Sequence, residues 1–268
     1  MNRSTLLWAV STVIACSVAD AGWSQSLLPP IEAKRAVDLE FLHPDRDHYP
    51  DKTTAGIWTV GYRTQLGTST ALRGELPMTR FEGGRHSGIW DSRTPVGAPY
   101  VGVELGRPGG TITELGIRLP FAEEDGQAQL YGAQTDPMRI EAVASDVLGL
   151  ITRWRIRSAN KVFDPILTIG FKMFLPVSAG RDAELIGDYG VSYVHSTRSW
   201  SFMTGLRGTI ALSTGGSIGE RTMHEFASAV RLRYHNFLPV LQLRVPLDDN
   251  VGRYVKAVYG FGLIVILD

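Results

Sequence analysis

The chain has 268 residues, and its 27 basic and 27 acidic side chains give a formal net charge of zero. This balance argues against a nucleic-acid partner, which would require a basic surplus to meet phosphate charges. Cys16 is the only cysteine, so a single chain can form neither an internal disulfide nor a thiolate metal site. The scattered histidines show no metal-ligand spacing, and the sequence predicts no cofactor.

The first 21 residues have the plan of a secretory signal peptide. Arg3 precedes an apolar stretch over residues 6–19, which leads into the small-residue pattern Ala19-Asp20-Ala21. We expect cleavage between Ala21 and Gly22, so that residues 1–21 are removed and residues 22–34 form a periplasmic leader.

A lipoprotein signal is the rival interpretation of the N-terminus. Val13-Ile14-Ala15-Cys16 resembles a lipobox, in which Cys16 would be acylated and become the first residue. Both pathways take the chain out of the cytoplasm.

The rest of the chain alternates between apolar and polar residues with a period of two, which is the signature of β-strands. In residues 164–175, for example, Ile169 and Phe171 share one face, while Gly170 and Lys172 share the other. The clearest predicted strands are 56–65, 99–106, 164–175, 199–212, 223–234, 237–246 and 253–267, and the further candidates are 36–42, 69–76, 111–120, 149–158 and 185–195.

One region has an ambiguous period. From Asp136, apolar residues recur at the spacing of a helix, which Asp136 could cap and Pro137 could begin. The apolar residues of this stretch also fit the alternation of a strand equally well. The sequence therefore predicts either a short helix or a strand over residues 137–151.

These segments predict an all-β fold: an antiparallel, up-and-down transmembrane β-barrel of about 12 strands, an even number between 10 and 14. After the N-terminus no apolar run is long enough for a membrane helix. The export signal and the aromatic residues toward strand ends favour the outer membrane over a soluble periplasmic β-protein. Residues 35–268 would form the barrel, with outer-membrane lipid and the barrel-assembly machinery as partners.

Two motifs carry a family resemblance. Residues 259–267 resemble the C-terminal strand that the barrel-assembly machinery reads, although the chain ends Leu267-Asp268 and not on an aromatic residue. Leu-Pro or Val-Pro pairs close strand candidates at Pro77, Pro120, Pro176 and Pro246. This repeat resembles the outer-membrane proteins grouped under MetA-pathway phenol degradation, and the resemblance implies a channel for hydrophobic compounds.

The polar faces of the predicted strands carry many charges. Arg153, Arg155 and Arg157 alternate along one strand and should form an inward-facing ladder. The other basic lumen-lining candidates are Arg63, Arg73, Arg118, Lys172, Arg207, Arg231, Arg233, Arg244 and Lys256, and the acidic candidates are Asp38, Glu40, Glu75, Glu104, Glu114 and Glu225. The lumen is then either closed by an Arg–Glu network or open as a basic channel that prefers anions.

The expected function is a narrow, porin-like channel for small solutes, either anions or hydrophobic compounds. The first alternative is a structural or interaction barrel without transport, and the second is a lipid-modifying barrel enzyme. Enzyme candidates are the pairs His86-Ser87, His195-Ser196 and His224-Glu225. Adjacent strand residues point to opposite faces, so the pairs within strands cannot act together and we expect no enzyme.

Overall fold

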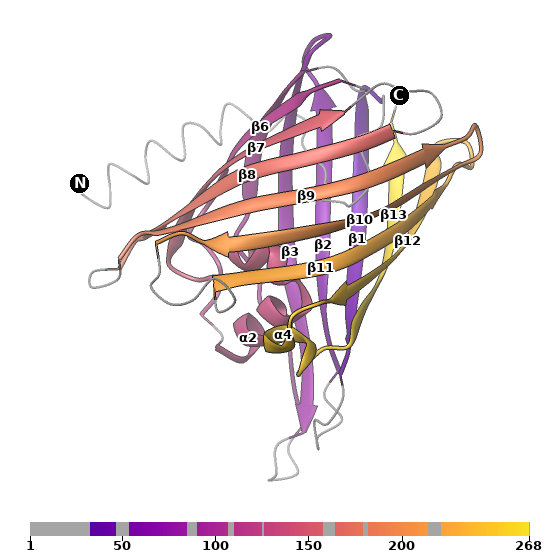
Figure 1. Ribbon diagram of the computed structural model, residues 1–268. Coiled ribbons are helices and arrows are strands. Elements are labelled where there is room, and N and C mark those ends of the chain that lie inside the picture. Colours follow the sequence, from indigo (N-terminus) through magenta and orange to yellow (C-terminus); the bar gives the residue numbers. More distant parts are fainter. Residues whose placement is uncertain are drawn as a thin grey trace.

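The computed structural model in Figure 1 describes residues 33–46, 54–84, 90–106, 110–124, 126–157, 164–178, 182–213 and 221–267. The predicted signal peptide with its Ala21–Gly22 cleavage site, Cys16 and most of the leader lie outside these residues, as does His86-Ser87. The predictions about them stay predictions.

Twelve antiparallel strands close into a barrel, as the sequence predicts (Figure 1). They are β1 (Arg35–Asp45), β2 (Thr54–Gln65), β3 (Thr70–Gly84), β5 (Tyr100–Gly106), β6 (Ile112–Arg118), β7 (Val147–Arg157), β8 (Asp164–Pro176), β9 (Glu184–Ser196), β10 (Trp200–Ala211), β11 (Thr222–Leu232), β12 (Phe237–Pro246) and β13 (Ala257–Ile266). The pairing of β1 with β13 closes the ring, with Ala36 opposite Ile266. A short additional strand, β4 (Trp90–Arg93), extends only the far end of β3.

The strand predicted over residues 69–76 is longer than expected. β3 runs through Pro77 to Gly84 because its partner on one side changes from β5 to β4 near this residue. Pro77 therefore lies between the β3–β5 pairing and the β3–β4 pairing. No strand hydrogen bond is needed there from the N–H that proline lacks. Its carbonyl still accepts a hydrogen bond from the Gly97 amide.

The two ends of the barrel differ. At one end, short connections such as residues 66–69, 197–199 and 233–236 join successive strands, and both the start of β1 and the end of β13 lie there. We call this the turn end. The opposite loop end carries the longer connections, among them α2 (Gly126–Thr135) and α4 (Asp249–Gly252), which Figure 1 shows at that end.

The strands have an apolar outer face and a mostly polar inner face. In β8, Phe171 is 43% exposed on the outside, whereas the adjacent Lys172 is 1% exposed on the inside. The outer face is apolar over the whole ring, as in Leu39, Leu115 and Leu241. Among the residues that the structure describes, no helix is long and apolar enough to span a membrane.

The ambiguous region before β7 is helical only in part. A 3-10 helix, η1 (Pro137–Ala142), begins after Asp136 and has Pro137 in its first turn, while residues from Val147 onward belong to β7. Asp136 makes no side-chain capping bond, because its carboxylate is engaged by arginines. The helix α2 just before it was not predicted. We call residues 126–142 the lumen segment, because its side chains contact inward-facing residues of several strands.

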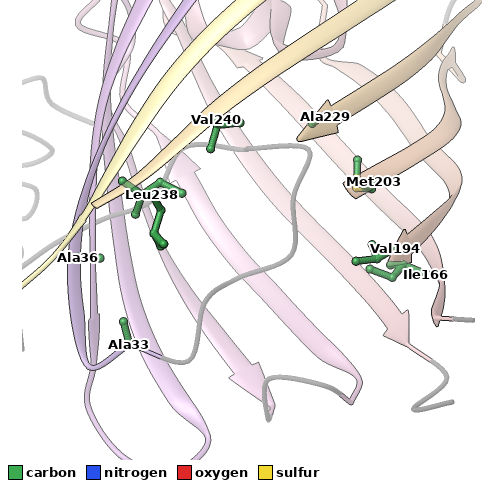
Figure 2. Close-up of a cluster of buried hydrophobic side chains, with 9 residues drawn as sticks. Ala33, Ala36, Ile166, Val194, Met203, Ala229, Leu238 and Val240 are labelled. Carbon is green, nitrogen blue, oxygen red and sulfur yellow. The ribbon is translucent and has the colours of Figure 1, made fainter. Parts of the chain in front are cut away.

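Toward the turn end the inner wall is apolar on one side. Figure 2 shows Ile166, Val194, Met203, Leu238 and Val240, which belong to β8, β9, β10 and β12 and form one buried cluster with Ala36 of β1. A second apolar cluster at the loop end packs Val143, next to the lumen segment, against Leu42 and Val258 of the wall. Apolar contacts therefore anchor one end of the lumen segment.

Candidate functional site: the charged lumen

The centre of the lumen is built around the buried carboxylate of Glu114. Arg73 approaches its Oε1 at 2.9 Å, and Arg153 and Arg155 each approach its Oε2 at 3.3 Å. The Tyr100 hydroxyl donates a hydrogen bond of 2.7 Å to Oε1. Charge-assisted bonds of this kind compensate the cost of removing a carboxylate from water.

Two glycines make room for Tyr100. A Cβ atom at Gly102 or at Gly116 would lie 2.2 Å from the tyrosine hydroxyl oxygen. The ring therefore occupies space on its own strand β5 and on the neighbouring strand β6 that only glycine leaves free, and this places the hydroxyl beside Glu114.

Two more carboxylates extend the network along the wall. The Glu104 carboxylate forms ion pairs with Arg63 and Arg155, at N–O distances of 2.9 Å and 3.2 Å. The Glu75 carboxylate forms ion pairs with Arg73 and Arg118, at N–O distances of 2.8 Å and 2.6 Å. Since Arg73 contacts both Glu75 and Glu114, the pairs form one connected network and not isolated bridges.

The arginine ladder of β7 faces the lumen. Arg153 binds Asp188 at 3.1 Å as well as Glu114, Arg155 binds Glu104 and Glu114, and Arg157 pairs with Asp164. Each cation therefore has a carboxylate partner on another strand, which relieves the repulsion within the ladder.

Solvent reaches the outer two arginines of the β7 ladder more easily than the central anions. The side chains of Arg155 and Arg157 are 18% and 24% exposed, whereas those of Glu104 and Glu114 are 4% and 0% exposed. A solute in the lumen would therefore meet guanidinium groups, with Glu104 and Glu114 behind them.

At the loop end, ion pairs join the lumen segment to the wall. Asp136 lies 2.9 Å from Arg244 of β12 and also pairs with Arg139. Arg139 in turn reaches Glu40 of β1, which also receives Arg244 at 3.2 Å. These four residues form a closed ring of alternating charge.

A second contact lies on the opposite side of the segment. Lys172 of β8 donates to the Met138 carbonyl and lies 3.2 Å from Glu141. It also lies 3.3 Å from Asp188, so this lysine joins the lumen segment to the ladder network. The segment is thus held from both sides of the barrel.

The ionisation of Asp136 follows from its neighbours. Burial alone would raise its pKa, but the guanidinium groups of Arg139, Arg244 and Arg207 outweigh burial and hold the pKa well below its usual range. The carboxylate is therefore charged at neutral pH and balances the guanidinium charge beside it.

The remaining predicted lumen residues lie as follows. Arg207 pairs with Glu225 on the neighbouring strand, Asp38 is buried, and Arg231 is half-buried on the inward parity of β11. Arg233 and Lys256 lie outside the strands, next to their ends, and both are exposed.

Several carboxylates of the network were missed in the sequence. Asp188 and Asp164 share the inward parity of their strands and could have been found by that pattern. Asp136 and Glu141 could not, because their positions depend on the path of the lumen segment, which no periodicity encodes. With these acids included, the lumen is much closer to electrical neutrality than the predicted faces indicate.

The histidine pairs separate as the strand geometry requires. His195 faces outward, and its ring lies tilted against that of Trp200 with 5.3 Å between the centroids. Glu225 points inward to Arg207, while His224 is on the outer face with different partners, Tyr189 and Asp248. Within the described ranges, no group of three or more His, Cys, Asp or Glu side chains could hold a metal ion.

Comparison with solved structures identifies the fold. The COG4313 outer-membrane channel from Pseudomonas putida F1 is similar with a TM-score of 0.60 and 11% sequence identity, over 91% of this chain and 99% of that chain. The translocator domain of the autotransporter NalP from Neisseria meningitidis has a TM-score of 0.49 and 8% identity, over 98% of this chain and 95% of that chain. The NanC porin has a TM-score of 0.48 and 8% identity, over 87% of this chain and 99% of that chain. The last two scores are too low to add to the argument.

No family model and no curated protein matches the chain. The chain has the fold of an outer-membrane β-barrel, as the sequence predicts, and shares this fold with the COG4313 outer-membrane channel.

Proposed function

We propose that this protein is a narrow outer-membrane channel for small solutes, that its lumen prefers anions, and that the lumen segment restricts the loop end. The observation that carries the proposal is the charged lumen. A barrel with a purely structural role could be filled with apolar side chains, and replacing a buried ion pair by such side chains is often neutral or stabilising. A lumen lined by ion pairs is costly to build but suits hydrated solutes.

The preference for anions rests on the exposed guanidinium groups. Because Arg155 and Arg157 are more exposed than their partner carboxylates on Glu104, Glu114 and Asp164, we infer a positive potential on the solvent side of the ladder. Rings of Arg and Lys select anions in other pores. The paired acids reduce this preference, so we expect it to be modest.

The loop end would face the outside of the cell and the turn end the periplasm, since outer-membrane barrels have short periplasmic turns and longer external loops. The lumen segment then lies at the external entrance. Buried ion pairs hold the segment on two sides and apolar contacts anchor one end, so it suits a fixed constriction of the entrance.

The experiment is a reversal-potential measurement under a salt gradient in planar bilayers. We expect the native protein to conduct and to select anions. Arg155→Gln and Arg157→Gln should shift the reversal potential toward zero. Arg198→Gln, which changes an exposed arginine in a turn of the same end, should leave it unchanged.

A cation-selective pore, or selectivity indifferent to both ladder changes, would contradict the preference for anions. A barrel without transport is the competing function, and the complete pairing of the ladder favours it. Asp136→Asn removes the charge that joins the lumen segment to Arg244. A barrel without transport would be supported if neither the native protein nor this variant conducted ions.

A further inference from the structure

Three polar side chains form a hydrogen-bonded relay on the outer face of the barrel near the loop end. The His224 ring contacts Asp248 Oδ1 through Nδ1 at 2.9 Å and the Tyr189 hydroxyl through Nε2 at 2.6 Å. The backbone amide of His224 also donates to Asp248 Oδ2. The residues come from β9, β11 and the connection after β12, so no sequence motif brings them together.

The sheet is shaped to allow this contact. Gly208 of β10 lies between Tyr189 and His224 in the strand register. A Cβ atom at Gly208 would lie 2.7 Å from both Cζ and Oη of Tyr189. Only glycine lets the tyrosine ring cross β10 to reach the histidine two strands away.

The relay is located where lipid would surround the barrel. Val191, Leu206 and Leu247, on the same strands or next to the relay, are each more than half exposed. His224 follows the first residues of β11, and Asp248 lies beyond the end of β12, so the relay is near the rim. The apolar outer band of a membrane barrel ends near its rim, next to the lipid head groups. Ionisable side chains facing lipid are costly and commonly functional.

The order of groups is that of a nucleophile, a base and an orienting acid. Asp248 accepts a hydrogen bond from Nδ1–H, and this assigns the lone pair of the neutral imidazole to Nε2. Nε2 then accepts the proton of the Tyr189 hydroxyl. Tyr189 lies on the outer face of β9 and is 37% exposed, so the proposed nucleophile is on the lipid side of the wall.

We propose that Tyr189, His224 and Asp248 form a catalytic site that cleaves ester bonds of lipids in the surrounding membrane. The Tyr189 oxygen attacks the ester carbonyl while His224 Nε2 takes the phenolic proton. The carbon–oxygen bond to the lipid alkoxide breaks, and the alkoxide leaves with the proton from His224. Water, deprotonated by His224, then attacks the carbonyl carbon of the aryl ester. The bond between this carbon and the Tyr189 oxygen breaks, the fatty acid leaves, and the tyrosine oxygen takes the proton back from His224 Nε2.

The roles of the three residues differ. Tyr189 and His224 touch the reacting atoms, whereas Asp248 is a positioning residue that fixes the tautomer and orientation of the imidazole. The site is on the opposite side of the wall from the lumen, so this inference does not depend on transport.

The test uses the full-length protein in detergent, with 4-nitrophenyl butyrate and phosphatidylethanolamine mixed micelles as substrates. We expect hydrolysis of both and, after rapid acid quenching, an acyl adduct on Tyr189 by peptide mass spectrometry. Tyr189→Phe, which retains the ring over Gly208, and His224→Gln should each lower the rate at least tenfold. Asp248→Asn should lower kcat and leave KM unchanged.

Tyr259→Phe is the matched control, because Tyr259 is exposed on the outer face of β13 and has no described part in the relay. Heat-modifiable migration of every variant verifies folding. The proposal is overturned if the folded native protein hydrolyses neither substrate, if Tyr189→Phe retains the native rate, or if the adduct forms on another residue.

Discussion

The carboxylate of Asp136 lies 2.9 Å from a guanidinium nitrogen of Arg244 and so joins the lumen segment to the barrel wall. Arg139 and Glu40 complete the ring of charges. This ring brings residues from the connection after β6 into contact with β1 and β12, strands at the two ends of the chain.

Removal of the Asp136 charge should loosen the lumen segment. Asp136→Asn leaves the buried guanidinium groups of Arg139 and Arg244 without this carboxylate, and breaking a buried pair costs about 3–5 kcal/mol. We expect faster hydrogen exchange in residues 126–142 and a higher conductance. Asp146→Asn, in the turn before β7, is the control. Native exchange rates in Asp136→Asn would mean that apolar packing holds the segment.

The pH dependence of the same contact follows from the lowered pKa of Asp136. A lowered pKa in the folded state contributes stability above the unfolded value of about 3.9, and this contribution is lost as the pH falls toward the folded value. Hydrogen exchange in the lumen segment should therefore be constant from about pH 8 to pH 5, apart from the intrinsic chemical rate. It should accelerate only below about pH 4, and acceleration already near pH 6 would assign the effect to another group.

A charge added to the outer face of β8 should lower the stability of the barrel much more than a charge added to its inner face. Ile169 is exposed on the apolar outer face, and Ile169→Arg should destabilise the folded barrel in lipid vesicles by roughly 2–4 kcal/mol. Thr168→Arg places the same side chain in the lumen and should cost much less. Guanidinium titrations of refolded protein measure both. Similar losses for the two variants would contradict the assigned faces.

The contact between Gly116 and Tyr100 gives a packing test. Gly116→Ala places a methyl group where the tyrosine hydroxyl now lies, and overpacking of this kind typically costs about 1–3 kcal/mol. In the background of Tyr100→Leu the same substitution should cost less, because the ring is gone. A double-mutant cycle from denaturant titrations measures the coupling. Additive effects would show that the ring moves aside freely.

Mass spectrometry of the mature protein tests the predicted export signal. We expect Gly22 to be the first residue, since the small residues 19–21 suit signal peptidase. A first residue at Cys16 bearing lipid would instead establish the lipoprotein pathway.

Alternation in the sequence was sufficient to predict the twelve strands and the faces of residues such as Phe171 and Lys172, because a strand points successive side chains to opposite sides. It also placed the Arg153, Arg155 and Arg157 ladder on one parity. Local period says nothing, however, about which strands meet across a lumen or how a connection folds back. The sequence therefore gave no sign that Asp136 would meet Arg244.

The tertiary structure alone decided three features. The pairing and register of the neighbouring strands β3, β5, β6 and β7 bring Glu114 under three arginines of two different strands. The folding of residues 126–142 into the lumen supplies acids that no strand pattern contains. The glycine at position 208 lets Tyr189 reach His224 across a whole strand. Each feature depends on distances between residues that are separated in the chain, and such distances are fixed only when the strands pair in register and the connections fold back onto them.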